Sequence, residues 1–350
     1  MVNAIGADRP FITIVLPCRN EEPYIAACLD SILATTYPLD RMEVLVVEGM
    51  SEDGTRDVLA SYVARHSVIR VIDNRRQITP AALNVGIRAA TGEIIVRMDA
   101  HVVYPPEYIP RLIDALQSSD ADNVGGIIVT LPGDNTPMAR AIAVGLSHPF
   151  AVGNAYFRIG LSAPRWVDSV PFGCFRREVF DRVGLFDEEL VRNEDEEFNL
   201  RLVKYGGRIL LLPEVVSYYF ARRRLRDLGR MYYQYGYFKP LVVRKADGVM
   251  TLRQVVPALF VAILAGSIAL APVLPVLGIA VGVAAAYLAT MTVCVLGAVR
   301  KHGWRCALAL AAVFPVVHFS YGIGSLRGAF DHLLQRRRAR RDPTVIPLSR

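Results

Sequence analysis

The sequence predicts an α/β domain followed by a transmembrane helical region at the C-terminal end. Short β-branched runs alternate with longer amphipathic stretches from Phe11 to about Pro213, which is typical of an α/β domain. From Val255 to Val299 the chain then contains no charged residue. With 350 residues, 53% of them hydrophobic, the chain is long enough for one large domain with its own core and a smaller apolar appendage.

Six apolar runs are the strand candidates of the first domain. They are FITIVLP (11–17), MEVLVVE (42–48), VIRVID (68–73), EIIVRM (93–98), VGGIIVTL (124–131) and RILLLP (208–213). Because these runs are almost continuously apolar, they indicate a sheet that helices cover on both faces. Helices are expected between the strands at about 22–35, 54–64, 79–91, 106–117 and 194–204.

The charge-free run is too long for a single membrane span of about 20 residues, so it predicts a hairpin. The PVLP segment at 272–275 divides it into spans near 254–271 and 276–299. A third apolar stretch, 304–326, contains Pro315, which is expected to interrupt it. Before the hairpin, residues 225–245 interleave Arg and Lys with Tyr and Phe, a pattern that favours a helix at the membrane interface.

Basic residues determine the expected membrane orientation. Arg300, Lys301 and Arg305 follow the hairpin, and the sequence QRRRARR follows the third stretch, so both flanks are expected in the cytoplasm. Two crossings with a re-entrant third segment satisfy this rule. A third crossing with an exported tail is the alternative.

Charge and cysteine content restrict the class of protein. A formal net charge of +7 suits an anionic partner, which leaves nucleic acid, a phosphorylated substrate or an acidic membrane surface. The apolar C-terminal third argues against nucleic acid. The five cysteines are scattered without a C-x-x-C pair, so neither a disulfide framework nor a zinc site is expected. The N-terminus lacks the pattern of a cleavable signal peptide, so the first domain is expected to stay in the cytosol.

Polar motifs follow the first two predicted strands, where α/β sheets bind their ligands. PCRNEE (17–22) ends the first strand and EGMSEDGT (48–55) ends the second. Glu48 and Asp53 have side chains that accept hydrogen bonds from a base or a ribose, although acidic strand ends are more often helix caps or turn residues. The G-x-G-x-x-G turn of a dinucleotide-dependent oxidoreductase is absent after the first strand.

The fourth strand candidate continues into MDAH, which suggests a divalent metal site. Asp99 and His101 occupy alternate positions, so in an extended strand both side chains face the same ion. A carboxylate with an imidazole suits Mn²⁺ somewhat better than Mg²⁺. The alternative is a capping aspartate and a packed histidine.

Three motifs further along the chain are candidates for a catalytic base, for contact with the acceptor and for binding phosphate groups. NEDEEFNLRL (193–202) places Glu194 and Asp195 in the first turn of a helix, where the helix dipole also stabilises carboxylates. In PFGCFRRE (171–178), Gly173 permits an acceptor to approach the backbone, or simply allows a loop before a helix. Arg222 and Arg230, in a cluster of five arginines, are candidates for binding a diphosphate or anionic lipid.

Taken in order, these motifs resemble family 2 glycosyltransferases. The motifs are PCRNEE, EGMSEDGT, TPAALNVGIRAATGEIIVRMDAH, PFGCFRR, NEDEEFNLRL and RMYYQYGYFK. Within the family, the DAH triplet and the apolar hairpin are most similar to the glucosyltransferases of succinoglycan biosynthesis. The resemblance implies a GT-A fold with a mixed, mostly parallel sheet, a nucleotide-diphosphate sugar as donor, a divalent cation (Mn²⁺ or Mg²⁺) and inversion at the anomeric carbon.

The resemblance also implies roles for particular residues. Asp195, with Glu194 beside it, is implied as the catalytic base, and Asp99 with His101 as the metal motif. The implied donor-binding residues are Pro17, Arg19, Asn20, Glu22, Glu48, Asp53, Asn84, Arg88 and Asp99. This chain departs from the family in ending its D-x-D metal motif with His101. It also lacks the Q-x-x-R-W signature of processive synthases, which favours the addition of a single sugar.

The function implied is transfer of one hexose, as glucose from UDP-glucose, to a hydroxyl of a lipid-linked saccharide in exopolysaccharide or cell-envelope glycan synthesis. The enzyme is expected in the bacterial inner membrane, with several crossings and a cytoplasmic catalytic domain. The predicted parts are a GT-A domain (1–220), an interfacial segment (221–253), the membrane region (254–326) and a basic tail (327–350). The alternatives are a polyprenyl-phosphate sugar synthase and a non-catalytic membrane scaffold.

Overall fold

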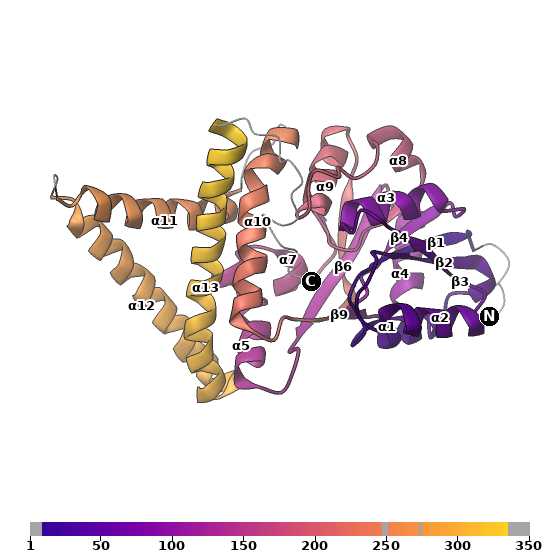
Figure 1. Ribbon diagram of the computed structural model, residues 1–350, viewed down its shortest axis with the longest axis horizontal. Coiled ribbons are helices and arrows are strands. Elements are labelled where there is room, and N and C mark those ends of the chain that lie inside the picture. Colours follow the sequence, from indigo (N-terminus) through magenta and orange to yellow (C-terminus); the bar gives the residue numbers. More distant parts are fainter. Residues whose placement is uncertain (1–8, 247–250, 273–274, 335–350) are drawn as a thin grey trace. The chain divides into compact units, whose positions relative to one another are not determined.

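A computed structural model describes residues 9–246, 251–272 and 275–334 of the chain (Figure 1). These form two compact units, one from residues up to 129 together with 160–219 and the other from 130–159 together with the chain after 219. The sequence predicts one uninterrupted domain up to residue 220. In the structure, residues 130–159 pack with the C-terminal helices of the second unit, and the predicted domain bounds stay a prediction.

The first unit is built on a mixed sheet of nine strands within the described residues, in the order β3-β2-β1-β4-β8-β6-β9-β5, with β7 paired to β9. The strands are β1 (Ile12–Cys18), β2 (Met42–Glu48), β3 (Ile69–Asp73), β4 (Ile94–Arg97), β5 (Val102–Val103), β6 (Asn123–Leu131), β7 (Arg165–Val167), β8 (Cys174–Arg176) and β9 (Ile209–Phe220). Strands β1 to β4 are parallel, whereas β8 pairs antiparallel with β4 and β6. The expected α/β class with a mixed sheet is confirmed.

The connections of the parallel strands determine where a ligand site forms. Helices α1 (Ile25–Leu33) and α2 (Thr55–Arg65) follow β1 and β2, and α3 (Thr79–Ala89) follows β3. Figure 1 shows α1 and α2 on one side of these strands and α3 on the other. The strand order therefore reverses between β1 and β4, and such a reversal opens a crevice at the carboxyl ends of the two strands.

The structure contains several short elements that the apolar pattern does not predict. Strands β5, β7 and β8 have two or three residues each, and β8 lies inside the segment 171–178 that is expected to be a loop. Such strands are too short for periodicity, and their pairing with β9, β4 and β6 creates them. The remaining helices of the first unit are η1 (Leu39–Arg41), α4 (Tyr108–Ser118), α8 (Glu178–Val183) and α9 (Glu194–Lys204).

The second unit is helical, and its helices α12 (Leu277–His302) and Trp304–His332 are long and apolar enough to cross a membrane, judged by length and composition. The second of these consists of α13 (Trp304–Ala329) and the start of η2 (Phe330–Leu334). The other elements of this unit are α5 (Pro137–Gly145), α6 (Pro149–Val152), α7 (Tyr156–Ile159), α10 (Leu225–Ala246) and α11 (Leu252–Leu270). The apolar part of α11, Gln254–Leu270, is a shorter helix.

The expected interruption at Pro315 is wrong, because α13 is one continuous helix with Pro315 in its interior. A proline removes one backbone hydrogen bond, and packing of α13 against α10 and α5 offsets that loss. Residues 273–274 of the predicted break at 272–275 and residues 335–350 of the predicted tail 327–350 lie outside the described residues.

Glycines bring the backbones of α10 and α13 into direct contact. A Cβ atom added at Gly236 of α10 would lie 2.1 Å from the carbonyl oxygen of Tyr321. In α13, a Cβ at Gly324 or Gly328 would lie 2.2 Å or 2.0 Å from a carbonyl oxygen of α10. These distances are shorter than any van der Waals contact, so each position requires glycine.

We expect Gly236→Ala to lower the stability of the second unit by about 1–3 kcal/mol, because the added methyl group forces the two helices apart. Thermal unfolding in detergent measures this effect. Gly282→Ala in α12 is the matched control, since its Cβ would have no neighbour within 4 Å. Equal unfolding temperatures of the two variants would contradict the close packing.

Candidate active site

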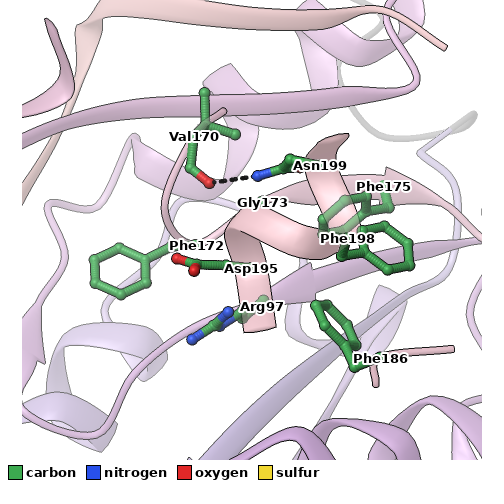
Figure 2. Close-up of a pocket in the computed structure, with 9 residues that line it drawn as sticks. All are labelled: Arg97, Val170, Phe172, Gly173, Phe175, Phe186, Asp195, Phe198 and Asn199. Atoms are coloured by element: carbon green, nitrogen blue, oxygen red, sulfur yellow. Dashed lines mark hydrogen bonds between the residues drawn. The ribbon is translucent and has the colours of Figure 1, made fainter. Parts of the chain in front are cut away.

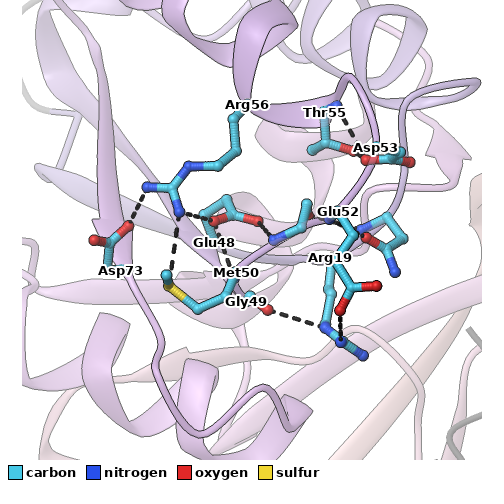
Figure 3. Close-up of polar contacts among 11 residues, drawn as sticks. Arg19, Glu48, Gly49, Met50, Glu52, Asp53, Thr55, Arg56 and Asp73 are labelled. Atoms are coloured by element: carbon cyan, nitrogen blue, oxygen red, sulfur yellow. Dashed lines mark hydrogen bonds and ion pairs between the residues drawn. The ribbon is translucent and has the colours of Figure 1, made fainter.

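The loops after β1 and β2 are tied together by hydrogen bonds. The backbone N–H of Asn20 donates to Ser51 Oγ over 2.9 Å, and the Asn20 amide oxygen accepts from the backbone of Glu52. Glu22 accepts from the backbone of Gly54 over 3.0 Å. Figure 3 shows Arg19 reaching the Gly49 carbonyl and Glu52 from the first loop. The residues of these two loops that the sequence predicts to bind the nucleotide sugar are therefore connected by hydrogen bonds at the edge of the sheet.

Glu48 organises the second loop from within. Its side chain is fully buried, and its carboxylate accepts hydrogen bonds from the backbone N–H groups of Met50 and Ser51. Arg56 pairs with Glu48 at 3.0 Å and with Asp73 at 2.7 Å (Figure 3). With no exposed surface, Glu48 holds the shape of this loop, and its predicted contact with a nucleotide stays a prediction.

Left-handed backbone conformations occur at non-glycine residues around this edge. Asn20 follows β1, Met50 follows β2 and Gln77 follows β3, with φ values of 53°, 57° and 59°. Phe172 and Asn193, with φ of 50° and 62°, precede β8 and α9. Such strained residues persist where the surrounding structure holds them, and they concentrate at functional sites.

The segment after β4 differs from its expected geometry. Strand β4 ends at Arg97, and His101 lies in a turn, so strand alternation does not set the directions of Asp99 and His101. The His101 Nδ1 atom lies 3.0 Å from Glu21 Oε1, and Asp99 Oδ1 lies 3.6 Å from Arg97 Nε.

Helix α9 begins at Glu194 and separates the environments of two adjacent carboxylates. Glu194 is buried and accepts a hydrogen bond of 3.0 Å from Arg97 Nη2. Asp195 accepts from the backbone N–H of Glu196 and lines a small pocket together with Arg97, Phe172 and six other residues (Figure 2). Of the two acidic residues, Asp195 is the one that lines this pocket.

Burial changes the acidity of both carboxyl groups. It raises the pKa of Glu194 to about 7, and the guanidinium of Arg97 opposes this shift. Burial also raises the pKa of Asp195, again against the effect of Arg97. A carboxylate with a raised pKa is a stronger proton acceptor, which suits a general base near neutral pH.

Gly173 lines the same pocket, and packing explains its identity. A Cβ at this position would lie 2.4 Å from Asn123 Oδ1 and 2.4 Å from the ring of Phe175. Its carbonyl oxygen accepts the backbone N–H of Arg97 over 2.9 Å. Gly173 therefore leaves room for the side chains of Asn123 and Phe175, and its carbonyl holds the backbone of Arg97 in place.

The other predicted site residues do not line this pocket. Asn84 is buried and makes three hydrogen bonds of 2.9 Å to Phe186 and Glu188, so it fixes the loop that leads to α9. Arg88 is exposed near the end of α3. Arg222 and Arg230 belong to the second unit, so their part in phosphate binding stays a prediction.

Sequence reasoning missed Arg97 and Glu21. Arg97 lies between Asp99 and Glu194 and is almost fully buried. The signal in the sequence is that Arg97 is the single charged residue of the apolar run IIVRM. Glu21 lies in the predicted motif PCRNEE but only the tertiary structure brings it to His101.

A divalent cation fits the residues after β4. Asp99 Oδ1 is buried without a hydrogen-bond partner, and the contact of His101 with Glu21 involves Nδ1 and leaves Nε2 for a ligand. A carboxylate and an imidazole are suitable donors for Mn²⁺. Within the described residues, no three His, Cys, Asp or Glu side chains gather into a complete site, so a diphosphate or water would supply the further ligands.

Comparison with solved structures identifies the fold. The mannosyltransferase PcManGT of Pyrobaculum calidifontis, solved in complex with GDP-Man and Mn²⁺, aligns with a TM-score of 0.58 at 21% identity, covering 93% of this chain and 88% of its own. The expected GT-A fold is confirmed.

Sequence comparisons then give the family. The model of glycosyl transferase family 2 matches residues 13–184. The succinoglycan biosynthesis protein ExoA of Rhizobium meliloti is 30% identical over 91% of this chain and 94% of its own length. A dolichyl N-acetyl-α-D-glucosaminyl phosphate 3-β-D-2,3-diacetamido-2,3-dideoxy-β-D-glucuronosyltransferase of Methanococcus voltae is 29% identical over 67% of this chain and 74% of its own length. The chain belongs to glycosyltransferase family 2, which confirms the expected transferase.

Proposed function

We propose that this enzyme transfers a single hexose, glucose from UDP-glucose, to a hydroxyl of a lipid-linked saccharide during synthesis of an exopolysaccharide or cell-envelope glycan. The observation that carries the proposal is Asp195, which lines a pocket beside Arg97 while Glu194 is paired and buried. A hydroxyl acceptor must lose a proton, and the proposal assigns Asp195 as the group that takes it.

The proposed reaction is a direct displacement. Asp195 accepts the proton of the acceptor hydroxyl, whose oxygen forms a bond to the anomeric carbon. The bond from that carbon to the diphosphate breaks, and UDP leaves with the electron pair, so the configuration inverts. Asp99 and His101 would hold a divalent cation, which would offset the charge that develops on the diphosphate. The loops of β1 and β2 hold the nucleotide in position.

The two long apolar helices and the basic residues around them support a membrane location. We propose several crossings of the inner membrane, with the catalytic domain in the cytoplasm. The name of the Methanococcus voltae relative, which describes a dolichyl-linked acceptor, supports a lipid-linked acceptor, and that of the succinoglycan protein supports a part in polysaccharide synthesis. A membrane anchor keeps the enzyme where such an acceptor resides.

The expected metal dependence gives a direct test of the donor site. Asp99→Ala should remove the part of UDP affinity that depends on Mn²⁺ and leave metal-free affinity nearly unchanged, since the loops of β1 and β2 persist. Calorimetric titration of UDP with and without Mn²⁺ measures both values. If Asp99→Ala retains the full Mn²⁺ effect, the metal assignment is wrong.

A polyprenyl-phosphate sugar synthase is the second candidate function. Its acceptor is already an anion and needs no base, so the position of Asp195 favours a hydroxyl acceptor. An assay that offers labelled UDP-glucose with either polyprenyl phosphate or a lipid-linked saccharide distinguishes the two. A screen of UDP- and GDP-sugars for Mn²⁺-dependent transfer then settles the donor.

A further inference from the structure

The loop after β1 supplies a buried carboxylate to the turn after β4. Glu21 is only 5% exposed, and its Oε1 atom lies 3.0 Å from His101 Nδ1. The backbone N–H of Glu21 donates to Thr55 Oγ1 over 2.8 Å, which ties this residue to the start of α2. Two loops at neighbouring strand ends therefore hold the carboxylate in a fixed place beside the imidazole.

This contact determines which nitrogen of His101 carries the proton. An ionised carboxylate only accepts hydrogen bonds, so a neutral imidazole beside it must carry its proton on Nδ1. The lone pair is then on Nε2, which becomes the free donor atom. The ring of Tyr219 meets the His101 ring edge-on at 5.2 Å and restricts its rotation.

A hydrogen bond from its backbone also holds the neighbouring Asp99 in place. Its backbone N–H donates to the Tyr104 hydroxyl over 2.8 Å, while its buried Oδ1 makes no hydrogen bond in the described structure. A histidine that binds a metal almost always donates its second ring nitrogen to a carboxylate, a carbonyl or water. The Glu21–His101 pair has that arrangement.

We propose that Glu21 is a positioning residue, which fixes His101 in the tautomer that offers Nε2 to a divalent cation beside Asp99. The proposal rests on the metal role of Asp99 and His101 in the proposed function. It explains how a neutral histidine replaces the second aspartate of the D-x-D motif, because hydrogen bonding to the Glu21 carboxylate makes the imidazole a stronger donor.

The test measures Mn²⁺ binding to the full chain in detergent with excess UDP, from the loss of the free-Mn²⁺ EPR signal against a protein-free blank. Glu21→Ala should weaken Mn²⁺ binding by about 10- to 100-fold. Glu21→Gln keeps an oxygen acceptor for Nδ1–H and should lose less. Asp57→Asn, an exposed carboxylate in the first turn of α2, removes the same charge and should bind Mn²⁺ like the wild type.

A double variant separates positioning from an independent effect. Glu21→Ala should add no further loss in the His101→Ala background, because the residue that it positions is gone. If Glu21→Ala matches Asp57→Asn, or if it weakens His101→Ala by the same factor as the wild type, the positioning role is overturned. If Asp99→Ala and His101→Ala both keep wild-type Mn²⁺ affinity, the metal assignment itself fails.

A spectroscopic measurement on the unmodified enzyme covers the case in which Glu21→Ala does not fold. The imidazole ¹⁵N signals of His101, identified by their loss in His101→Ala, should report a proton on Nδ1 in the metal-free enzyme. A proton on Nε2 instead would overturn the proposal.

Discussion

Asp195→Asn is expected to lower the rate of sugar transfer by about 10²- to 10⁴-fold, the usual loss when a positioned base is removed. Asparagine has nearly the same shape, so the pocket beside Arg97 and Phe172 should persist. UDP affinity should also persist, because the donor loops belong to β1 and β2. Single-turnover kinetics with a lipid-linked acceptor and calorimetry with UDP measure the two quantities separately.

Glu196→Gln provides the matched control, since it is the next carboxylate in the same turn of α9 and does not line the pocket. It should transfer sugar at nearly the wild-type rate. Near-normal turnover by Asp195→Asn would remove Asp195 from the role of base. A loss of equal size in both variants would instead indicate damage to the start of the helix.

Arg97→Met is expected to affect both stability and activity. Arg97 is the buried cation next to Glu194 and Asp99, and breaking a buried ion pair by removing one partner typically costs about 3–5 kcal/mol. Arg70→Met, at an exposed pair with Glu43, should cost less than about 1 kcal/mol. Thermal unfolding of the two variants at pH 8 makes the comparison, and equal stability would contradict the importance of the buried pair.

The pH dependence of Arg97→Met has a defined sign. Burial already raises the pKa of Glu194 to about 7, and Arg97 opposes this shift, so its removal raises the pKa further. A group whose pKa is raised by folding stabilises the fold less as the pH rises through that pKa. The destabilisation by Arg97→Met should therefore be larger at pH 8 than at pH 6.

The pH dependence of sugar transfer should also change in Arg97→Met, because Asp195 acts as a base only when ionised. In Arg97→Met, the pH at which transfer reaches half of its maximum should move upwards. Adding Glu194→Gln removes the unpaired buried charge and should restore part of the lost stability. A double variant no more stable than Arg97→Met would contradict pairing with Glu194 as the cause.

The order of motifs in the sequence determined the family, and the apolar pattern determined most of the large elements. Helix α9 occupies the expected residues 194–204, and the first four strands coincide with their candidates within two residues at either end. This success has a physical reason, because long buried strands and amphipathic helices show their environment in the spacing of their own apolar residues.

The membrane region shows the limit of local reasoning. Pro315 is a sound local signal for a helix break, yet α13 continues through it. Helix α13 packs closely against α10 at Gly324 and Gly328, and that packing is a property of two distant segments. The sequence around a single residue does not contain this information.

For the carboxylates of the site, the sequence predicts the residues and the tertiary structure decides their contacts. By itself, the sequence predicts that Glu194, Asp195, Asp99 and His101 carry the chemistry, because it contains those residue types in motifs that resemble the family. Only the tertiary structure decided that Glu194 pairs with Arg97, that Asp195 faces the pocket and that Glu21 meets His101. The contact of Glu21 with His101 joins the loops after β1 and β4, which lie together because the strand order reverses between these strands, and the contact of Arg97 with Glu194 joins the end of β4 to the start of α9.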